Sequence, residues 1–213
     1  CSKSGHVWAA GRGGISRFDP QTQRWTYHTD HPAWAVSLVN ALAEDEAGHL
    51  LLALDRGGIA RYDGKVFQFL DRRDGVARGS AYDVVPTRDG SIWITTSTGI
   101  TRYQPSPGKP HLSMQGLLAD RDYSADEEIS FASGQPRVEI SYQGRDLKTR
   151  PEAMVYRFRL VGVDSTWATT NDTKVIYEDL ASGDYTFEVE VVDRDLGYSD
   201  LATLSFRVTP PYG

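Results

Sequence analysis

The chain has 213 residues, of which 29 are Asp or Glu and 23 are Lys or Arg, so its formal net charge is −6. An acidic chain without a basic stripe is not typical of nucleic-acid-binding proteins, and we expect no nucleic-acid partner. No apolar run approaches the roughly 20 residues of a membrane-spanning helix, and no basic-then-apolar signal peptide opens the sequence.

The single cysteine, Cys1, rules out a disulfide within the chain. Two interpretations of this residue stay open. A mature lipoprotein also begins with a cysteine, and Cys-Ser-Lys-Ser is a tolerable start for one. Since one residue is no motif, we favour the interpretation that the segment simply begins here.

A sequence frame occurs three times in the first half of the chain. Its copies open at Gly5, Gly48 and Gly90, in steps of 43 and 42 residues. A fixed period of this size is the mark of a repeat architecture. The shared positions, in copy order, are Trp8, Leu51 and Trp93, then Gly14-Ile15, Gly58-Ile59 and Gly99-Ile100, then Arg17-Phe18, Arg61-Tyr62 and Arg102-Tyr103.

Within each copy, short apolar segments alternate with Gly and Asp. The runs 49–54 and 92–94 predict strands that are buried on two faces, and Gly57-Gly58 predicts a tight turn. Four short strands per repeat are typical of a β-propeller blade, and no helix-length segment supports a helical repeat.

We therefore predict an all-β chain in which residues 1–111 form a partial β-propeller of about two to three four-stranded blades. Closed propellers use 4–8 blades. Either these blades are the C-terminal part of a larger propeller, which we favour, or other copies of the chain complete the ring.

The frame Gly-x-x-Trp-x-x-x-x-x-Gly-Ile-x-Arg-Tyr resembles the propeller repeat of two-component regulators. Three copies agree with it over roughly half of the chain, and Leu51 departs from the expected aromatic residue. The resemblance implies the extracytoplasmic part of a bacterial hybrid sensor kinase.

The second half of the chain has a different charge and a different pattern. Residues 1–111 hold 13 Lys/Arg against 11 Asp/Glu, whereas residues 112–213 hold 10 against 18. Three prolines in Pro105-Ser-Pro-Gly-Lys-Pro110 interrupt strand pairing and predict a domain boundary. Beyond it, apolar and polar residues alternate over 137–142, 154–161, 185–192 and 201–208. Such alternation predicts a second domain, an antiparallel β-sandwich of the immunoglobulin or fibronectin type, over residues 112–213.

Several motifs in this half resemble the triple-tyrosine (Y_Y_Y) sandwich domain, over residues 136–212. In sensors that carry it, this domain follows the propellers and lies directly outside the membrane. The resemblance implies that a transmembrane segment follows Gly213, which would be the only contact with the membrane. The matching residues are the run Tyr156–Asp164, Trp167, Tyr177, Leu180-x-x-Gly183-x-Tyr185, Asp193-x-x-x-Gly197-Tyr198-Ser199 and Pro210-Pro211-Tyr212, with Phe158 and Tyr212 as departures.

Most of the conspicuous aromatic residues are expected to be structural. We assign Tyr156, Trp167, Tyr177 and Tyr185 to core and corner packing, and Tyr185 to a tyrosine corner, rather than to a ligand platform. The repeat-frame residues Trp8, Phe18, Tyr62, Trp93 and Tyr103 are expected in the blade cores. His28-Thr-Asp-His31 lacks a third well-spaced ligand, so we expect no metal site there, and we expect no cofactor.

Arg12 and Arg56 are the candidate ligand-binding residues. Both lie in the turn between the first two strands of a frame copy, and such turns can line one face of a ring. Two arginines on adjacent blades could hold an anionic or hydroxyl-rich ligand by forked hydrogen bonds, although solvated loop charges are the commoner alternative.

No motif for nucleophilic, metal-dependent or phosphate-transfer catalysis occurs, so we predict that this segment is not an enzyme. The function implied by the resemblance is the periplasmic, ligand-sensing region of an inner-membrane receptor, a two-component histidine kinase or a diguanylate cyclase. The expected ligand is a small molecule or oligosaccharide, and the sandwich is expected to relay the signal by rearrangement of a homodimer. The alternative is a secreted propeller enzyme or carbohydrate-binding protein with an accessory sandwich.

Overall fold

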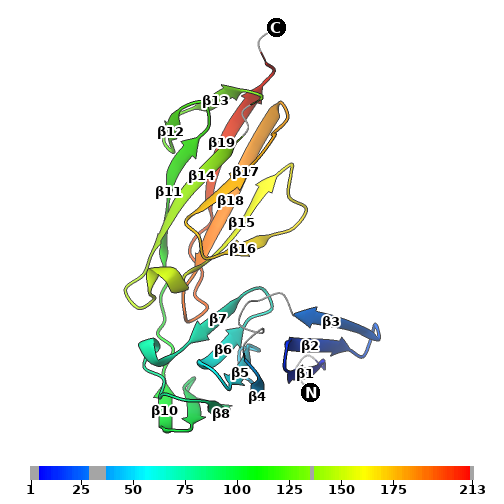
Figure 1. The fold of residues 1–213 in the computed structure, drawn as a ribbon, viewed down its shortest axis with the longest axis vertical. Helices are drawn as coiled ribbons and strands as arrows, with labels where there is room; N and C mark the ends of the chain where they lie inside the picture. Colours follow the sequence, from blue (N-terminus) through cyan, green and yellow to red (C-terminus); the bar gives the residue numbers. More distant parts are fainter. Residues whose placement is uncertain (1–4, 29–36, 135–136, 212–213) are drawn as a thin grey trace. The chain divides into compact units, whose positions relative to one another are not determined.

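The structure is a computed structural model that describes residues 5–28, 37–134 and 137–211. It is all-β and divides into two compact units, Cys1–Ser106 and Pro107–Gly213 (Figure 1). The division falls inside the proline-rich segment, a few residues before the expected position, because His111 already pairs with Arg145 in a sheet of the second unit. No helix among the described residues is long and apolar enough to cross a membrane.

The first unit consists of three antiparallel sheets, in the strand orders β1-β2-β3, β4-β5-β6-β7 and β10-β9-β8. The repeat frame places β1, β5 and β9 at equivalent positions. The strands are β1 Val7–Gly11, β2 Gly14–Asp19, β3 Arg24–His28, β4 Val39–Glu44, β5 Leu50–Leu54, β6 Gly58–Tyr62, β7 Phe67–Leu70, β8 Ala81–Pro86, β9 Ile92–Thr96 and β10 Gly99–Tyr103.

Of the four strands expected per blade, the described residues form all four only in the second sheet. The counterpart of β4 in the first sheet would precede Gly5, outside the described residues. The third sheet has no counterpart of β7, because the residues after β10 include Pro105, Pro107 and Pro110, which have no N–H to donate to a ladder.

The second sheet is covered on both faces, which explains its apolar sequence. Leu50, Leu52 and Leu54 belong to a core shared with Ile15 of the first sheet. Leu51 and Ala53 point the other way, into a core shared with Val84, Ile92 and Ile94 of the third sheet. Adjacent residues of a strand face opposite sides, so a strand between two partners must be apolar throughout.

The third sheet corrects one expectation about burial. The run 92–94 was predicted to be buried on both faces, but Trp93 is 42 % exposed. Of the frame aromatics expected in the blade cores, Tyr62 and Tyr103 are buried, whereas Trp8 and Phe18 are half-buried. Burial at Trp93 requires another sheet against that face, which the described chain does not supply.

The second unit is a sandwich of a four-stranded sheet, β12-β11-β14-β17, and a five-stranded sheet, β13-β19-β18-β15-β16. All pairs are antiparallel except β13 with β19. The strands are β11 His111–Leu118, β12 Asp122–Ser124, β13 Ile129–Ala132, β14 Val138–Arg145, β15 Val155–Val161, β16 Ala168–Thr170, β17 Lys174–Tyr177, β18 Gly183–Val192 and β19 Ala202–Thr209.

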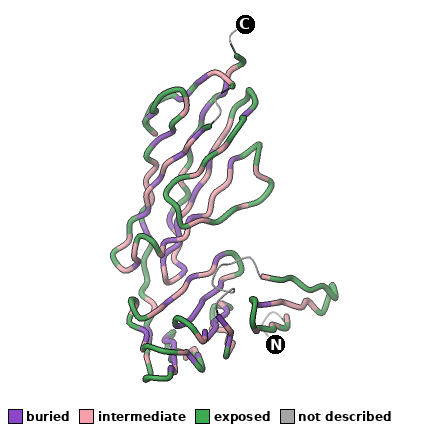
Figure 2. Tube along the Cα trace, in the orientation of Figure 1, coloured by how far each residue is buried: buried purple, intermediate pink, exposed green. Residues whose placement is uncertain are grey.

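The sandwich has one core, built from the inward residues of both sheets (Figure 2). Along β18, the buried Phe187, Val189 and Val191 alternate with Glu188 and Glu190, as the sequence predicts. One apolar face per strand is the pattern that packs two sheets together.

Candidate functional site: an arginine-lined pocket

A pocket of about 450 Å³ lies in the first unit, between the second and third sheets. Three segments line it: the β5–β6 turn at 55–58, residues 71–72 after β7, and residues 77–80 before β8. Each segment contributes one exposed arginine, Arg56, Arg72 and Arg78 respectively. The three arginines thus come from elements that are separate in the sequence.

The turn that carries Arg56 is fixed by glycine and by hydrogen bonds. Gly58 has φ +92, and a Cβ there would lie 2.0 Å from the carbonyl oxygen of Leu70. The Asp55 carboxylate accepts a hydrogen bond from the N–H of Leu38 at 2.6 Å, and the Ser37 hydroxyl donates to the carbonyl of Arg56 at 3.1 Å. The backbone of Arg56 is therefore held while its side chain stays exposed.

Arg72 begins a short 3₁₀ turn, η2 (Arg72–Asp74), which Asp71 and Asp74 close as a reciprocal capping box. Arg73 donates to both oxygens of Asp71, with a shortest contact of 2.7 Å. Gly75 ends the turn in the left-handed region at φ 92. Because Asp71 is already engaged by Arg73 and by the cap, the neighbouring Arg72 is left facing the pocket.

The segment around Arg78 is fastened to the β9–β10 turn. The carbonyl of Arg78 accepts from the Thr98 hydroxyl at 2.5 Å, and the carbonyl of Ser80 accepts from the N–H of Ser97 at 3.0 Å. Gly79 leaves room for this approach, since a Cβ there would lie 1.9 Å from the Ser97 hydroxyl. The third wall of the pocket is thus held by hydrogen bonds to the β9–β10 turn of the third sheet.

The pocket carries more positive than negative side chains. Within the described part of the chain, the guanidinium groups of Arg56, Arg72 and Arg78 form no ion pair and no hydrogen bond, while the two carboxylates of the lining, Asp55 and Asp71, are engaged. Unpaired guanidinium groups around one pocket can bind an anion through forked, charge-assisted hydrogen bonds.

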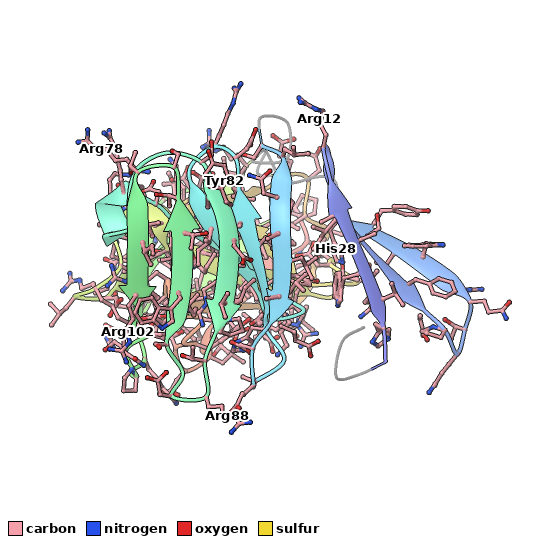
Figure 3. The ribbon with its side chains drawn as sticks, turned by 90° about the horizontal axis from the view of Figure 1, so that it is seen from below. Arg12, His28, Arg78, Tyr82, Arg88 and Arg102 are labelled. Atoms are coloured by element: carbon pink, nitrogen blue, oxygen red, sulfur yellow. The ribbon has the colours of Figure 1, made fainter. Side chains whose placement is uncertain are left out.

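Arg12 does not join this pocket. It lies in the β1–β2 turn and lines a separate pocket of about 220 Å³ with Gly11, Gly13 and Gly14. Arg12 and Arg78 project from the same edge of the sheets, and Arg88 projects from the opposite edge (Figure 3). The two arginines singled out in the sequence, Arg12 and Arg56, therefore line different pockets, and Arg56 shares its pocket with Arg72 and Arg78. The repeat frame could not indicate these two, since they lie in the segment between frame copies.

The assigned tyrosines of the second unit make specific contacts. The buried Tyr156 hydroxyl accepts a hydrogen bond from the N–H of Gly144 at 3.0 Å, and burial raises the pKa of Tyr156. Tyr177 donates to the Asp164 carboxylate at 2.7 Å; burial, and then this carboxylate, raise the pKa of Tyr177. Tyr185 donates to the carbonyl of Ala181 at 2.9 Å, which is the geometry of a tyrosine corner.

Trp167 differs from the expectation that it packs in the core. Its ring lies against the guanidinium groups of Arg157 and Arg159, at 4.9 and 4.8 Å, and it is not a member of the sandwich core. Arg157 and Arg159 point outward from β15, because Tyr156 and Leu160 point inward. Trp167 therefore covers the outer face of the five-stranded sheet through cation–π contacts.

Of the two histidines in His28-Thr-Asp-His31, only His28 lies within the described residues. Its ring lies among those of Trp8, Tyr62 and Phe67, and the distances between the ring centroids are 5.0 to 6.0 Å. Burial and, second, the charge of Arg17 lower the pKa of His28. His31 and Asp30 lie outside the described residues. In the described ranges, no three His, Cys, Asp or Glu residues group as a metal site.

The second unit has a match among known protein families. Residues 148–209 match the Y_Y_Y domain family. They run from the segment before β15 to the end of β19, so the earlier strands of the sandwich lie outside the matched range. The resemblance drawn from the tyrosine motifs is thereby confirmed for this range. The search of curated proteins gave no match.

The similar solved structures are described as extracellular domains. The one with a TM-score of 0.52 and 20% identity is described as the extracellular domain of a hybrid two-component system, BT3049, from B. thetaiotaomicron; the match covers 99% of this chain and 31% of that one. Two further structures show the extracellular domain of BT4673 from B. thetaiotaomicron. The one named as part of a one-component system has a TM-score of 0.40 and 18% identity, and the match covers 99% of this chain and 35% of that one. The one named as part of a hybrid two-component system has a TM-score of 0.41 and 14% identity, and the match covers 99% of this chain and 30% of that one. The chain spans about a third of these proteins. The first comparison establishes the fold.

Proposed function

We propose that this chain is part of the extracytoplasmic, ligand-sensing region of a membrane-bound bacterial signalling receptor. The observation that carries the proposal is the order of its parts, in which sheets of a propeller repeat are followed by a Y_Y_Y domain. The output that we infer is a two-component sensor histidine kinase, with a diguanylate cyclase as the variant. The segment itself is proposed to bind rather than to catalyse.

The arginine pocket is the ligand site in this proposal. Three unpaired guanidinium groups favour a ligand with an anionic group, since each can supply two parallel hydrogen bonds to a carboxylate, sulfate or phosphate. One wall belongs to the β5–β6 turn and another to the segment before β8, so a ligand that contacts both would bias how these two sheets pack. Ligand action requires such a difference in affinity between two arrangements.

The signal is proposed to reach the membrane through the sandwich, as a rearrangement of two sandwich domains in a homodimer. A transmembrane segment that follows the sandwich would carry it inward. The proposal places the chain in the periplasm, on an inner-membrane protein.

The test uses inorganic sulfate, inorganic phosphate and citrate as probes of the pocket, with thermal unfolding of the chain as the readout. We expect at least one of these anions to raise the melting temperature of the wild-type protein, because a ligand that binds only the folded state stabilises it. Arg56→Ala together with Arg78→Ala should abolish that shift. Arg88→Ala is the matched control, since it removes an exposed arginine from the opposite edge, and it should leave the shift unchanged.

An equal shift in the double variant and the wild type would contradict the assignment of the ligand to this pocket. Turnover of a glycan substrate by the purified chain would contradict the sensor proposal as a whole and favour the enzyme alternative.

A further inference from the structure

The arginine pocket holds two carboxylates beside its three guanidinium groups. Asp55 and Asp71 belong to the same lining as the arginines. An arginine that pairs with a neighbouring carboxylate has fewer N–H groups left for a ligand, because its donors are fixed in one planar fork. The affinity of the pocket for an anion therefore depends on what its own two carboxylates bind.

Asp55 is held by the backbone of the segment before β4. One oxygen of its carboxylate accepts the N–H of Leu38 at 2.6 Å, and the N–H of Asp55 donates to the carbonyl of Leu38 at 2.9 Å. This reciprocal pair commits the Asp55 carboxylate to a partner that is uncharged and lies outside the lining.

Asp71 is held by a side chain from outside the pocket lining, that of Arg73. Nη2 of Arg73 donates to Oδ2 of Asp71 at 2.7 Å, and Nε donates to both oxygens, at 3.2 Å to Oδ1 and 3.1 Å to Oδ2. The N–H of Arg73 also donates to Oδ1, at 2.7 Å. Both oxygens of the Asp71 carboxylate are thus engaged by one residue.

The turn around these residues does not depend on the Arg73 guanidinium. Its backbone is closed by the N–H of Asp74, which donates to the carbonyl of Asp71 at 2.9 Å, and by the N–H of Gly75, which donates to the carbonyl of Arg72 at 3.2 Å. The Asp74 carboxylate caps the N–H of Asp71 at 3.0 Å. Since the Arg73 side chain is 56 % exposed, its main contribution is the contact with the Asp71 carboxylate.

We propose that Arg73 is a positioning residue of the ligand site, which holds the Asp71 carboxylate so that Arg72 and Arg78 keep their guanidinium groups for an anionic ligand. Arg73 acts through Asp71 and needs no contact with the ligand. Without the Arg73 guanidinium, Asp71 becomes a free carboxylate in the lining, which pairs with an arginine of the pocket and repels an anion. This inference rests on the proposed ligand site and specifies how that site keeps its positive charge.

The experiment measures the dissociation constants of inorganic sulfate, inorganic phosphate and citrate by isothermal titration calorimetry at low ionic strength, where charge effects are least screened. Arg73→Ala should weaken binding of the anion that the wild type binds best by about three- to fivefold, the size of an ion-pair effect at a partly exposed site. Arg88→Ala is the matched control, since it removes an exposed arginine from the opposite edge of the sheets, and it should bind like the wild type.

A double-mutant cycle separates this role from a general loss of positive charge. Asp71→Asn removes the carboxylate charge and keeps a side-chain oxygen for the turn. The gain in anion affinity from Asp71→Asn should be about three- to fivefold larger in the Arg73→Ala background than in the wild-type background, because only there has the carboxylate been released. Recovery of binding in the double variant also shows that the turn and the pocket are folded.

The outcomes distinguish this inference from the ligand site on which it rests. A wild-type chain that binds none of the three anions would overturn both. Binding by the wild type with an equal dissociation constant in Arg73→Ala would overturn only the role of Arg73. Equal gains from Asp71→Asn in the two backgrounds would also overturn it, since the two charges would then act on the ligand independently rather than on each other.

Discussion

At the residue scale, two buried tyrosines of the sandwich differ in one hydrogen bond. The rings of Tyr142 and Tyr156 lie 4.9 Å apart in the same core. The Tyr156 hydroxyl accepts from the N–H of Gly144, whereas the Tyr142 hydroxyl is buried with no hydrogen-bond partner among the described residues. A hydroxyl stabilises a core only where a partner replaces the water that it loses.

Substitution of each tyrosine by phenylalanine tests this difference. Tyr156→Phe leaves the buried N–H of Gly144 without its acceptor and should lower the free energy of unfolding by about 1–3 kcal/mol. Tyr142→Phe removes an unpaired hydroxyl and should be neutral or stabilising by up to about 1 kcal/mol. Urea denaturation of the two variants measures both values, and equal losses would show that the hydrogen bond to Gly144 is not what separates them.

At the scale of elements, the β5–β6 turn illustrates how a repeat position constrains one residue and not its neighbour. Gly57 and Gly58 both have positive φ, 102 and 92. A Cβ on Gly57 would meet nothing within 4 Å, whereas one on Gly58 would lie 2.0 Å from the carbonyl of Leu70. Backbone strain is common to both positions, and the steric conflict with β7 belongs to Gly58 alone.

Alanine at each position separates the two effects. Gly57→Ala should cost about 1–3 kcal/mol of stability from the unfavourable φ. Gly58→Ala should cost more, about 4 kcal/mol or beyond, because β7 must move away and the arginine pocket beside it deforms. Thermal unfolding measures the loss of stability in each variant, and the same measurement with a bound anion shows whether the arginine pocket is deformed. Similar losses of stability in the two variants would mean that the turn relaxes without disturbing β7.

At the scale of the whole molecule, each of the two units has its own core and its own electrostatic contacts. In the second unit, Lys148 forms ion pairs with Asp193 at 2.9 Å and Asp195 at 3.3 Å, and the Asp193 side chain is 0 % exposed. Burial disfavours the charged Lys148, but the bonds to these carboxylates outweigh it and raise its pKa. The ion pair therefore holds the loop before β15 against the loop after β18.

Substitutions in one unit should therefore affect the unfolding of that unit. Lys148→Met leaves the Asp193 carboxylate buried without its cation and should lower the stability of the second unit by about 3–5 kcal/mol. Gly58→Ala should instead lower that of the first. Calorimetry should resolve two unfolding transitions, one for each unit. Lys148→Met should shift only the transition of the second unit, and Gly58→Ala only that of the first. A single transition shifted by both variants would show that the units unfold together.

The sequence by itself determined the repeat, its strands and the alternation of the sandwich, because strand pairing and turn chemistry are local. The Gly-x-x-Trp frame and the alternating Phe187–Val191 segment carry their own periodicity. The tyrosine motifs likewise indicated the Y_Y_Y domain, and Tyr185 its corner, since the partner of that hydroxyl is only four residues away.

Only the tertiary structure decided which residues meet across elements. Arg56, Arg72 and Arg78 share a pocket because β7, η2 and β8 return the chain to the same edge, and no spacing in the sequence encodes that return. Trp93 and Leu51 occupy the same place in the frame, yet one is exposed and the other buried. Burial depends on what packs against a face, which is a property of the neighbouring sheet rather than of the strand itself.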